Sequence, residues 1–412
     1  MIVIAHPNPI DVSTADRAVV QLFGAGARDQ VGGVGRAVML ATSRWRRRPS
    51  AGAWDFLAFA LAVEAADRLV LRSRGEDGWT RTIDLTTAVV DPDRMSAHAE
   101  RLAAALGFLS GDRWTFRFVE GGLRIPRSMK GRRREAVEPA CKTVCLFSGG
   151  ADSLAGAWQS LADRPTVLVS HAPRGDAMYQ RRLHARLPSR PAWFSAHANA
   201  TTPYEHRENS QRSRSLLFLA LAAMAASTLP AHQHGRQVKL LVPENGFMAI
   251  NAPLTARRIG SLSTRTTHPH FLRSINAIWA ELGLGVSIEN PLSHLTKGEV
   301  LAACEAPDAA ELFSETMSCG KWLRLNKHCG TCVPCLVRRA AFLHAGMQDA
   351  TDYNCTNLAT SKSDDVHAVR WALEQPKPRR RAAVLASGPI PNTEEAFAIH
   401  DRGLAELRAL LR

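Results

Sequence analysis

A glycine-containing loop after a short apolar segment is the first feature of this chain with the residue types for phosphate chemistry. The loop reads Ser148-Gly149-Gly150-Ala151-Asp152-Ser153 and directly follows the apolar run 144–147. Two glycines let the backbone point several N–H groups at an anion, and the start of a following helix adds its dipole. No Lys-Ser/Thr pair follows the glycines, so this is not the P-loop of kinases and GTPases. The loop predicts a phosphate cradle, and the alternative is an ordinary tight turn.

Four cysteines form a second group with chemistry-bearing spacing. Cys319, Cys329, Cys332 and Cys335 read C-x9-C-x2-C-x2-C. Four thiolates at such spacing suit a tetrahedral structural zinc, with no position left open for catalysis. An iron–sulfur cluster is the main alternative, because C-x2-C-x2-C also occurs in ferredoxin-type runs. Disulfides are not expected, because we find no signal-peptide pattern and the other cysteines show no paired framework.

Together and in this order, the two motifs resemble those of QueC, the 7-cyano-7-deazaguanine synthase family. The loop is similar to the PP-loop of the N-type ATP pyrophosphatases, which split ATP between the α and β phosphates. The stretch 316–342, which includes Arg338, resembles the QueC zinc signature almost residue for residue. The segment 214–222 resembles the family's Arg-Asn-x-x-Phe-Leu-x-x-Ala helix, with Ser215 in place of Asn, and 295–300 resembles its Lys-x-Glu segment. The resemblance covers about residues 141–345.

The resemblance implies ATP, Mg²⁺ and Zn²⁺ as cofactors and a role for each loop residue. Ser148, Gly149, Gly150 and Ser153 would contact the pyrophosphate part of ATP. Asp152 would contact Mg²⁺ or hold the loop itself. The loop thus supplies both nucleotide-binding and catalytic residues.

Further site residues follow from the matching positions outside the loop. Lys297, with Asp152 and Ser153, is a candidate catalytic residue, and Arg214 is a candidate for binding the cofactor. Either cation would contact a phosphate or a carboxylate, and the alternative for both is a surface or helix-end cation. Arg265 and His268 are candidate substrate contacts, and the alternative is that they are satisfied polar groups of a loop.

Two segments depart from the QueC pattern. The family usually carries Asp-Tyr-Gly-Gln after its second strand, where residues 170–176 read SHAPRGD. It also carries Asp-x-Ser-Gly-Tyr-Pro-Asp around the substrate base, where residues 260–270 read GSLSTRTTHPH. With an added N-terminal domain, this pattern resembles QatC, the QueC-like proteins of the Qat anti-phage defence system. That resemblance implies the other proteins of the system as partners, including a stable partner subunit.

Activation of a carboxylate by ATP is the chemistry that these features predict. Transfer of AMP to a carboxylate creates a good leaving group, pyrophosphate departs, and an amine can then attack. The resemblance implies a deazapurine such as 7-carboxy-7-deazaguanine as the carboxylate, with ammonia or an amine of a partner protein as acceptor. Two alternatives stay open: a defence-complex subunit that binds nucleotide without turnover, and an RNA-directed sulfur-transfer PP-loop enzyme, which would favour iron–sulfur over zinc.

The formal net charge of +14 leaves nucleic-acid binding open. Three arginine runs contribute to it, and they lie beside Pro or Gly with no interleaved aromatics apart from Trp45, at 46–48, 132–134 and 379–381. We expect them in linkers or loops that face solvent or a partner. The longest apolar stretch, 216–226, is too short to span a membrane and predicts a buried helix. Without a signal-peptide pattern, a cytoplasmic protein is expected.

The elements that must position these residues predict an α/β protein with a doubly wound, mostly parallel sheet, preceded by an N-terminal α+β domain. Residues 1–128 are expected to form the N-terminal domain for assembly or partner binding, and 129–140 a basic linker. The PP-loop domain is expected at 141–348, with the zinc motif at 319–335, and a helical tail at 349–412. Repeated strand–helix alternation places ligands at the carboxyl ends of the strands.

Hydrophobic periodicity predicts the individual elements. In the N-terminal domain we expect a strand pair at 67–72 and 79–85, a helix at 95–106 and a strand at 114–119. In the PP-loop domain the expected strands are 143–147, 166–170, 192–195, 238–242 and 286–289, and the expected helices are 152–162, 210–226, 271–282 and 297–303. An amphipathic helix at 393–412, started by Asn392 and Glu395 as a capping box, closes the chain.

Overall fold

The computed structural model describes residues 1–9, 13–26, 30–125, 140–172, 175–202, 207–255, 265–321, 325 and 327–412. Most of the predicted linker, residues 129–139 with the arginine run 132–134, lies outside the described residues. Parts of the two segments that depart from the QueC pattern, 173–174 and 260–264, lie outside them as well. The predicted domain boundaries therefore stay predictions.

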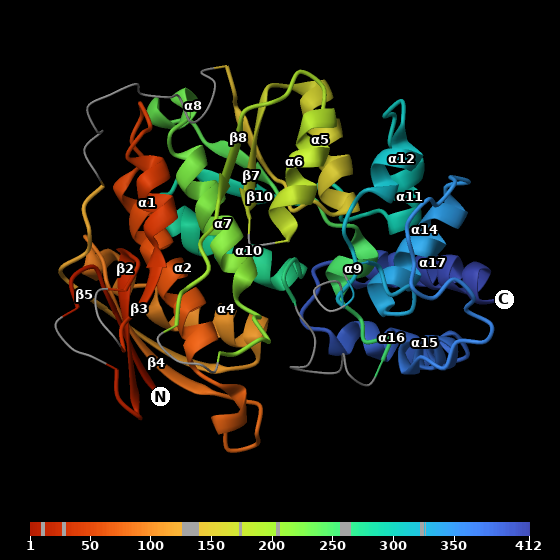
Figure 1. Ribbon diagram of the computed structural model, residues 1–412, viewed down its shortest axis with the longest axis horizontal. Helices are drawn as coiled ribbons and strands as arrows, with labels where there is room; N and C mark the ends of the chain where they lie inside the picture. The colour runs from red at the N-terminus through yellow and green to blue at the C-terminus, as the bar shows by residue number, and fades with distance from the viewer. Residues whose placement is uncertain are drawn as a thin grey trace.

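The N-terminal region forms a five-stranded, all-parallel sheet in the order β3-β2-β1-β4-β5 (Figure 1). The expected α+β arrangement was wrong, because every neighbouring pair of strands runs in the same direction. Parallel neighbours need crossover connections, and α2 and α4 provide those into β4 and β5. The bounds are β1 Ile2–His6, β2 Arg17–Gly24, β3 Gly32–Gly35, α1 Arg36–Thr42, α2 Ala51–Leu69, β4 Thr82–Ala88, α3 Pro92–Ser96, α4 Ala99–Ser110 and β5 Arg113–Val119.

Helix α2 takes the place of the first strand of the predicted pair. The side chain of Ser50 caps its start, and the N–H of Val70 closes its end on the carbonyl of Ala66. Residues 67–69 are its last turn, so the apolar alternation there did not mark a strand. The helix predicted at 95–106 is divided between α3 and α4, whereas the strand predicted at 114–119 is confirmed as β5.

The second sheet is also all parallel, in the order β10-β9-β6-β7-β8. The predicted strands are confirmed to within one residue at each end, and α7 begins four residues later than predicted. Because β6 has β7 on one side and β9 on the other, the strand order reverses beside the end of β6, where ligands bind in open α/β sheets. The bounds are β6 Thr143–Leu146, α5 Ala151–Asp163, β7 Thr166–His171, α6 Asp176–Arg186, β8 Trp193–Ala196, α7 Arg214–Ala226, α8 Pro230–Gln233, β9 Val238–Leu241, α9 Gly246–Ile250, α10 Pro269–Glu281, β10 Val286–Glu289, α11 Lys297–Ala302 and α12 Ala309–Ser314.

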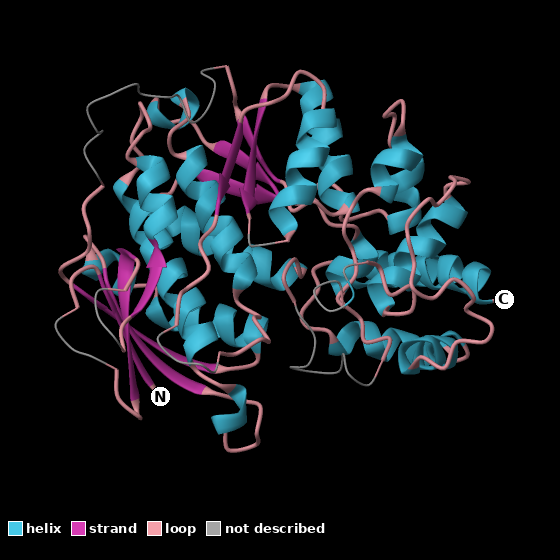
Figure 2. Cartoon of the chain, viewed as in Figure 1, coloured by secondary structure: helices cyan, strands magenta, loops and turns pink. Residues whose placement is uncertain are grey.

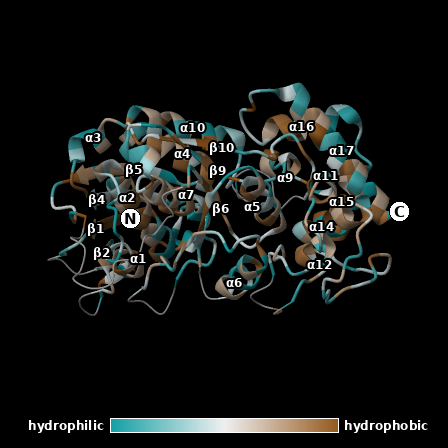
Figure 3. Cartoon of the chain, turned by 90° about the horizontal axis from the view of Figure 1, so that it is seen from above, coloured by the Kyte–Doolittle hydropathy of each residue, from teal (hydrophilic) through white to brown (hydrophobic). Residues whose placement is uncertain are grey.

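Two layers of helices lie between the two sheets (Figures 1 and 2). Helices α2 and α4 pack on the N-terminal sheet, α7 and α10 pack on the second sheet, and the pairs α2/α7 and α4/α10 meet in the middle. One hydrophobic core runs through the stack, from Val3 and Leu85 to Val144 and Val167. Hydrophobic segments gather in this interior, whereas α3 and α6 are more hydrophilic (Figure 3). The N-terminal region and the second sheet are therefore one packed body.

The C-terminal tail is helical, as predicted, and packs around a separate apolar cluster. Asn392 caps α17 through the N–H of Glu395, and Leu404 and Leu407 of its apolar stripe are buried. The arginine run 379–381 was expected in a loop but lies on α16, where Arg380 and Arg381 pair with acidic residues of α17. Among the described helices, none combines the length and apolar character that a membrane crossing requires. The bounds are α14 Val333–His344, α15 Asp364–Leu373, α16 Lys377–Ala386 and α17 Thr393–Leu411.

Candidate functional site

The loop 148–153 connects β6 to α5 at the strand-order reversal. Gly149 has φ of +89°, a left-handed conformation in which a side chain would be strained, and an added Cβ would lie 3.3 Å from Cγ of Gln180. Gly150 is the N-cap of α5 and supplies no side-chain cap. The hydroxyl of Ser153 donates to the Gly150 carbonyl at 2.9 Å. The Ser148 hydroxyl donates to the Ser153 hydroxyl at 3.2 Å. The loop thus presents an uncapped helix start and two hydroxyls, which suits an anion.

A buried ion pair lies beside the loop. The Nζ of Lys297 is 2.7 Å from Oδ2 of Asp152, and the side-chain amide of Asn245 donates to the same oxygen at 3.0 Å. Burial tends to raise the pKa of Asp152, but the charge of Lys297 and hydrogen bonds from neighbouring side chains outweigh it and lower the pKa. Lys297 is therefore a buried partner of the loop carboxylate and not a surface cation, and it lies at the end of a helix as the first residue of α11.

Arg214 belongs to a different helix beside the same loop. It is the first residue of α7, and its guanidinium donates to Asp176 at 2.8 Å and to Nδ1 of His171 at 3.4 Å. The guanidinium also lies 5.5 Å from the ring centre of Phe218. Burial and the positive charge of Arg214 hold the pKa of His171 well below its usual value, so that imidazole is neutral and can accept this bond.

A cavity of about 410 Å³ joins the loop to Arg214. A second cavity of about 290 Å³ shares the loop and contains Asp152 and Lys297. Volumes of this size are in the range of small-molecule sites. At the carboxyl ends of β6 and β9, these two cavities bring together Lys297, Arg214 and the predicted loop residues except Gly149, which lines neither. The larger cavity is lined among others by Ser148, Ser153, Arg214, Glu244, Thr266 and Cys319.

The interpretation of Arg265 and His268 as substrate contacts was wrong. The guanidinium of Arg265 lies 4.4 Å from the ring centre of Phe108 on α4 and donates to its carbonyl at 3.1 Å. His268 is fully buried against the same ring and lies 3.4 Å from the hydroxyl of Ser387. Burial and nearby cations lower the pKa of His268 to about 3. Both residues anchor their loop to the N-terminal region and to the tail, and the residues between them, 266 and 267, face the cavity.

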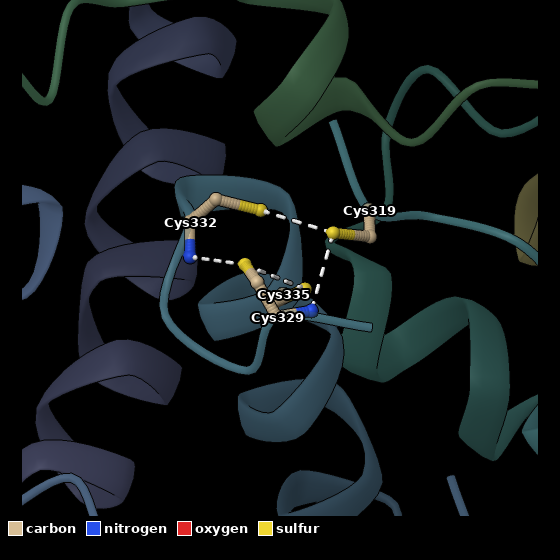
Figure 4. A group of neighbouring side chains, drawn as sticks. All are labelled: Cys319, Cys329, Cys332 and Cys335. Atoms are coloured by element: carbon tan, nitrogen blue, oxygen red, sulfur yellow. Dashed lines mark hydrogen bonds between the residues drawn. The ribbon is translucent and has the colours of Figure 1, made fainter. Parts of the chain in front are cut away.

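The four predicted metal ligands converge (Figure 4). The sulfurs of Cys319, Cys329, Cys332 and Cys335 lie within 4.8 Å of one another and all four residues are buried. The pairs Cys329/Cys335 and Cys332/Cys319 are 3.8 and 4.0 Å apart. Tetrahedral Zn–S bonds of ~2.3 Å place sulfurs about 3.8 Å apart, so the spacing fits one metal ion. These cysteines could therefore bind zinc.

The residues around the four cysteines, which we call the cysteine module, form part of the wall of the larger cavity through Met317, Ser318, Cys319, Gly320 and Pro334. The N–H of Met317 donates to the carbonyl of Gly149 at 3.0 Å, which joins the module directly to the loop 148–153. Arg338, which is buried, donates to the hydroxyls of Thr316 and Ser318 at 2.7 and 3.3 Å. Arg338, a predicted motif residue, thus fixes the segment 316–318, which contacts the loop 148–153.

Sequence reasoning missed several polar residues of the site. Gln180, fully buried on α6, donates to the carbonyls of Ser148 and His171 at 3.1 Å each and ties the ends of two strands together. Asn245 holds Asp152 and also caps α9. Asn245 follows a predicted strand closely, so the strand-end rule could have found it. Gln180 sits in a hydrophilic helix with no distinguishing local signal.

The fold and the site together define an α/β protein with a glycine loop at a switch point and a cysteine module that can hold a metal ion. A family model described as "Queuosine biosynthesis protein QueC" matches residues 266–346, from the loop that lines the cavity through the cysteine cluster to α14. The chain therefore carries a QueC-like domain, of the PP-loop, 7-cyano-7-deazaguanine synthase type, and this indicates an enzyme that uses ATP. No similar chain was found among curated proteins or among solved structures.

Proposed function

We propose that this chain is a PP-loop ligase that converts ATP to AMP and pyrophosphate while it activates a carboxylate for attack by an amine. One observation carries the proposal: the uncapped start of α5 opens onto a cavity beside the buried Asp152–Lys297 pair. A glycine loop of this kind binds phosphates through backbone N–H groups. The QueC-like domain supports the same chemistry.

The loop residues bind the leaving pyrophosphate in this proposal. Gly149 and Gly150 let the backbone approach the phosphates, and the hydroxyls of Ser148 and Ser153 add donors. Lys297 donates one N–H to Asp152, which leaves further N–H groups for a phosphate oxygen. Preorganised donors of this kind stabilise charge as it develops on the leaving group.

The reaction has two steps. A carboxylate oxygen of the substrate bonds to the α phosphorus, the bond from that phosphorus to the bridging oxygen breaks, and pyrophosphate leaves with the electron pair. The amine nitrogen then attacks the activated carbonyl carbon and loses a proton, and AMP leaves, so that an amide forms. Arg214, which lines the larger cavity, is placed to bind a phosphate or carboxylate oxygen.

The residues present also fit the implied metal ions. Oδ1 of Asp152 is buried and, within the described part of the chain, has no hydrogen-bond partner, so it could accept Mg²⁺ bound to ATP phosphates. Magnesium would neutralise phosphate charge. The four cysteines would hold a structural zinc with no open position, so no step of the reaction uses that site.

We further propose a role in anti-phage defence as a QatC-like protein with partner proteins of that system. The support is the resemblance in sequence together with the loop 265–268, which here is anchored by Phe108 of the N-terminal region. The carboxylate in this proposal is a deazapurine such as 7-carboxy-7-deazaguanine. The acceptor is ammonia or an amine of a partner protein.

Mass spectrometry of the purified complex tests the substrate and the acceptor together. The complex is incubated with ATP, magnesium, ammonia and 7-carboxy-7-deazaguanine, with the Ser153→Ala variant as control. The proposal expects AMP together with a modified small molecule or a mass increase on a partner protein, both lost in the variant. Bound but unconverted ATP would favour a nucleotide-binding subunit, and iron with inorganic sulfide would favour a sulfur-transfer enzyme.

A further inference from the structure

The end of α2 in the N-terminal region meets the start of α7 in the second sheet's helix layer (Figure 1). Asp67, in the last turn of α2, is completely buried at this junction. Its Oδ2 accepts from the backbone N–H groups of Arg212 and Ser213 at 2.8 and 2.9 Å, and from the Ser213 hydroxyl at 2.7 Å. The carboxylate therefore caps the residues directly before α7, where a negative charge also interacts favourably with the helix dipole.

The other oxygen of Asp67 is fixed by the N-terminal sheet. Oδ1 accepts from Arg81 at 2.5 Å, and Arg81 and Arg72 both pair with Asp112. Arg81 directly precedes β4 and Asp112 directly precedes β5, so these charges are set by the strands. The buried positive and negative groups are mutually hydrogen-bonded, which is the condition for a buried ionic cluster to be stable.

A second set of hydrogen bonds holds the segment that leads into α7. The N–H of Glu208 donates to the carbonyl of Arg68 at 2.9 Å, and the N–H of Arg72 donates to the Glu208 carboxylate at 2.9 Å. Residues on both sides of the α2 terminus thus bind the segment that leads into α7. This segment has little freedom to shift relative to the N-terminal sheet.

The first turn of α7 is a wall of the nucleotide cavity. Arg214, Ser215 and Phe218 all line the 410 Å³ cavity. Arg214 follows the capped Ser213 directly, so the position of its guanidinium depends on where Asp67 holds the start of the helix. A displacement of the cap would move the guanidinium away from Asp176 and His171.

We propose that Asp67 is a positioning residue of the nucleotide site: its carboxylate, held by Arg81, sets the start of α7 and thereby places Arg214 against the bound ATP. The inference rests on the proposed function, because it takes ATP as the ligand of the cavity. It gives the N-terminal region a defined part in the site, although none of the described residues of that region lines the cavity.

A double-mutant cycle on ATP affinity tests this inference. ATP–magnesium binding is measured by calorimetry for the wild-type chain, Asp67→Asn, Arg214→Ala and the double variant, with folding checked by thermal unfolding. Asp55→Asn is the matched control, because Asp55 is also a buried carboxylate of α2 that accepts two backbone N–H groups, from Val90 and Asp91 at 2.9 and 3.0 Å. Its partners lie within the N-terminal region, away from the cavity.

Each single site variant should weaken ATP binding about tenfold, and the double variant should be little weaker than either, because both remove the same contact. Asp55→Asn should lose thermal stability but keep ATP affinity within about twofold. Additive effects of Asp67→Asn and Arg214→Ala, or unchanged affinity in Asp67→Asn, would overturn the inference. A wild-type chain that does not bind ATP would overturn the proposed function itself. If Asp67→Asn does not fold, Ser213→Ala removes one contact of the same carboxylate and should weaken binding about twofold to threefold, with unchanged affinity again contradicting the inference.

Discussion

The two parallel sheets of this chain have the same number of strands and meet through their helix layers, yet they differ at the carboxyl ends of their central strands, β1 and β6. In the second sheet, β6 leads into the glycine loop 148–153, and a cavity lies at the carboxyl end of the strand. At the corresponding end of β1, an added Cβ on Gly121 would lie 2.5 Å from Nε2 of His6, so the chain itself fills the space. The cavity of about 290 Å³ at the N-terminal sheet lies instead at the amino ends of β1, β4 and β5. A parallel sheet provides the frame, and the residues at its strand ends decide whether it binds a ligand.

The largest effect of a substitution is expected in the second half of the chain, at the cysteine module. Cys332→Ser should abolish metal binding and most soluble protein, because a structural zinc contributes on the order of 10 kcal/mol to folding. Cys355→Ser is the control: its N–H donates to the carbonyl of Cys329 at 3.2 Å, but its sulfur is outside the cluster. Elemental analysis and thermal unfolding of both variants give the readout. A stable, metal-loaded Cys332→Ser protein would show that Cys332 is not needed to hold the metal.

The buried pair beside the phosphate loop should give the next largest effect. Lys297→Met leaves the Asp152 carboxylate buried without its cation and should cost about 3–5 kcal/mol at pH 7, with loss of ATP turnover. Lys239→Met is the control, because the pair of Lys239 and Glu289 at 3.0 Å on the same sheet is exposed and should change stability by less than about 1 kcal/mol.

The cost of Lys297→Met should also depend on pH. In the wild-type protein Lys297 lowers the pKa of Asp152, so the pair stabilises the fold above the unfolded pKa of the carboxyl group and loses this effect as pH falls through the folded pKa. In the variant, burial instead favours the protonated acid. The difference in unfolding free energy between the two proteins should therefore shrink from pH 7 towards pH 3. A difference that stays constant over this range would contradict the assigned charge pair.

A smaller effect should connect the two halves at the loop 265–268. Phe108→Ala removes the ring on which Arg265 and His268 pack, so the loop that carries the cavity-lining threonines should open more often. We expect backbone amides of 265–270 to exchange with solvent about tenfold faster, measured by hydrogen exchange with mass spectrometry. Arg117→Ala, on the exposed face of β5, is the control and should leave their exchange unchanged. If these amides exchange at the same rate in Phe108→Ala as in the wild-type protein, the loop is held by other contacts.

The same contrast explains how much the sequence could predict. In the second sheet, short strand patterns alternate with helical patterns along the chain, so the strands and the loop 148–153 were visible locally. In the N-terminal region, α2 is apolar nearly all round and has no polar stripe that marks a helix of 19 residues. Parallel pairing joins residues far apart in the chain. The sequence of β1, β4 and β5 therefore carries no local signal of which strands pair or in which direction.

The residues of the site also differ in whether the sequence could predict them. The loop 148–153 and the four cysteines depend on spacing within a short segment, so sequence reasoning found them. The buried charges Asp67 and Arg81 look like surface residues in the sequence, because only the fold brings their partners to them. The roles given to Arg265 and His268 failed for the same reason, since their partner Phe108 lies more than 150 residues earlier.

The products of ATP cleavage test the central claim most directly. The complete complex is incubated with ATP, magnesium and the carboxylate, and phosphorus NMR identifies the products in the wild-type protein and in Asp152→Ala. We predict AMP and pyrophosphate in equal amounts from the wild-type protein, and neither from the variant. ADP with inorganic phosphate, or wild-type turnover that survives in Asp152→Ala, would contradict the assignment of this loop as the site of α,β cleavage.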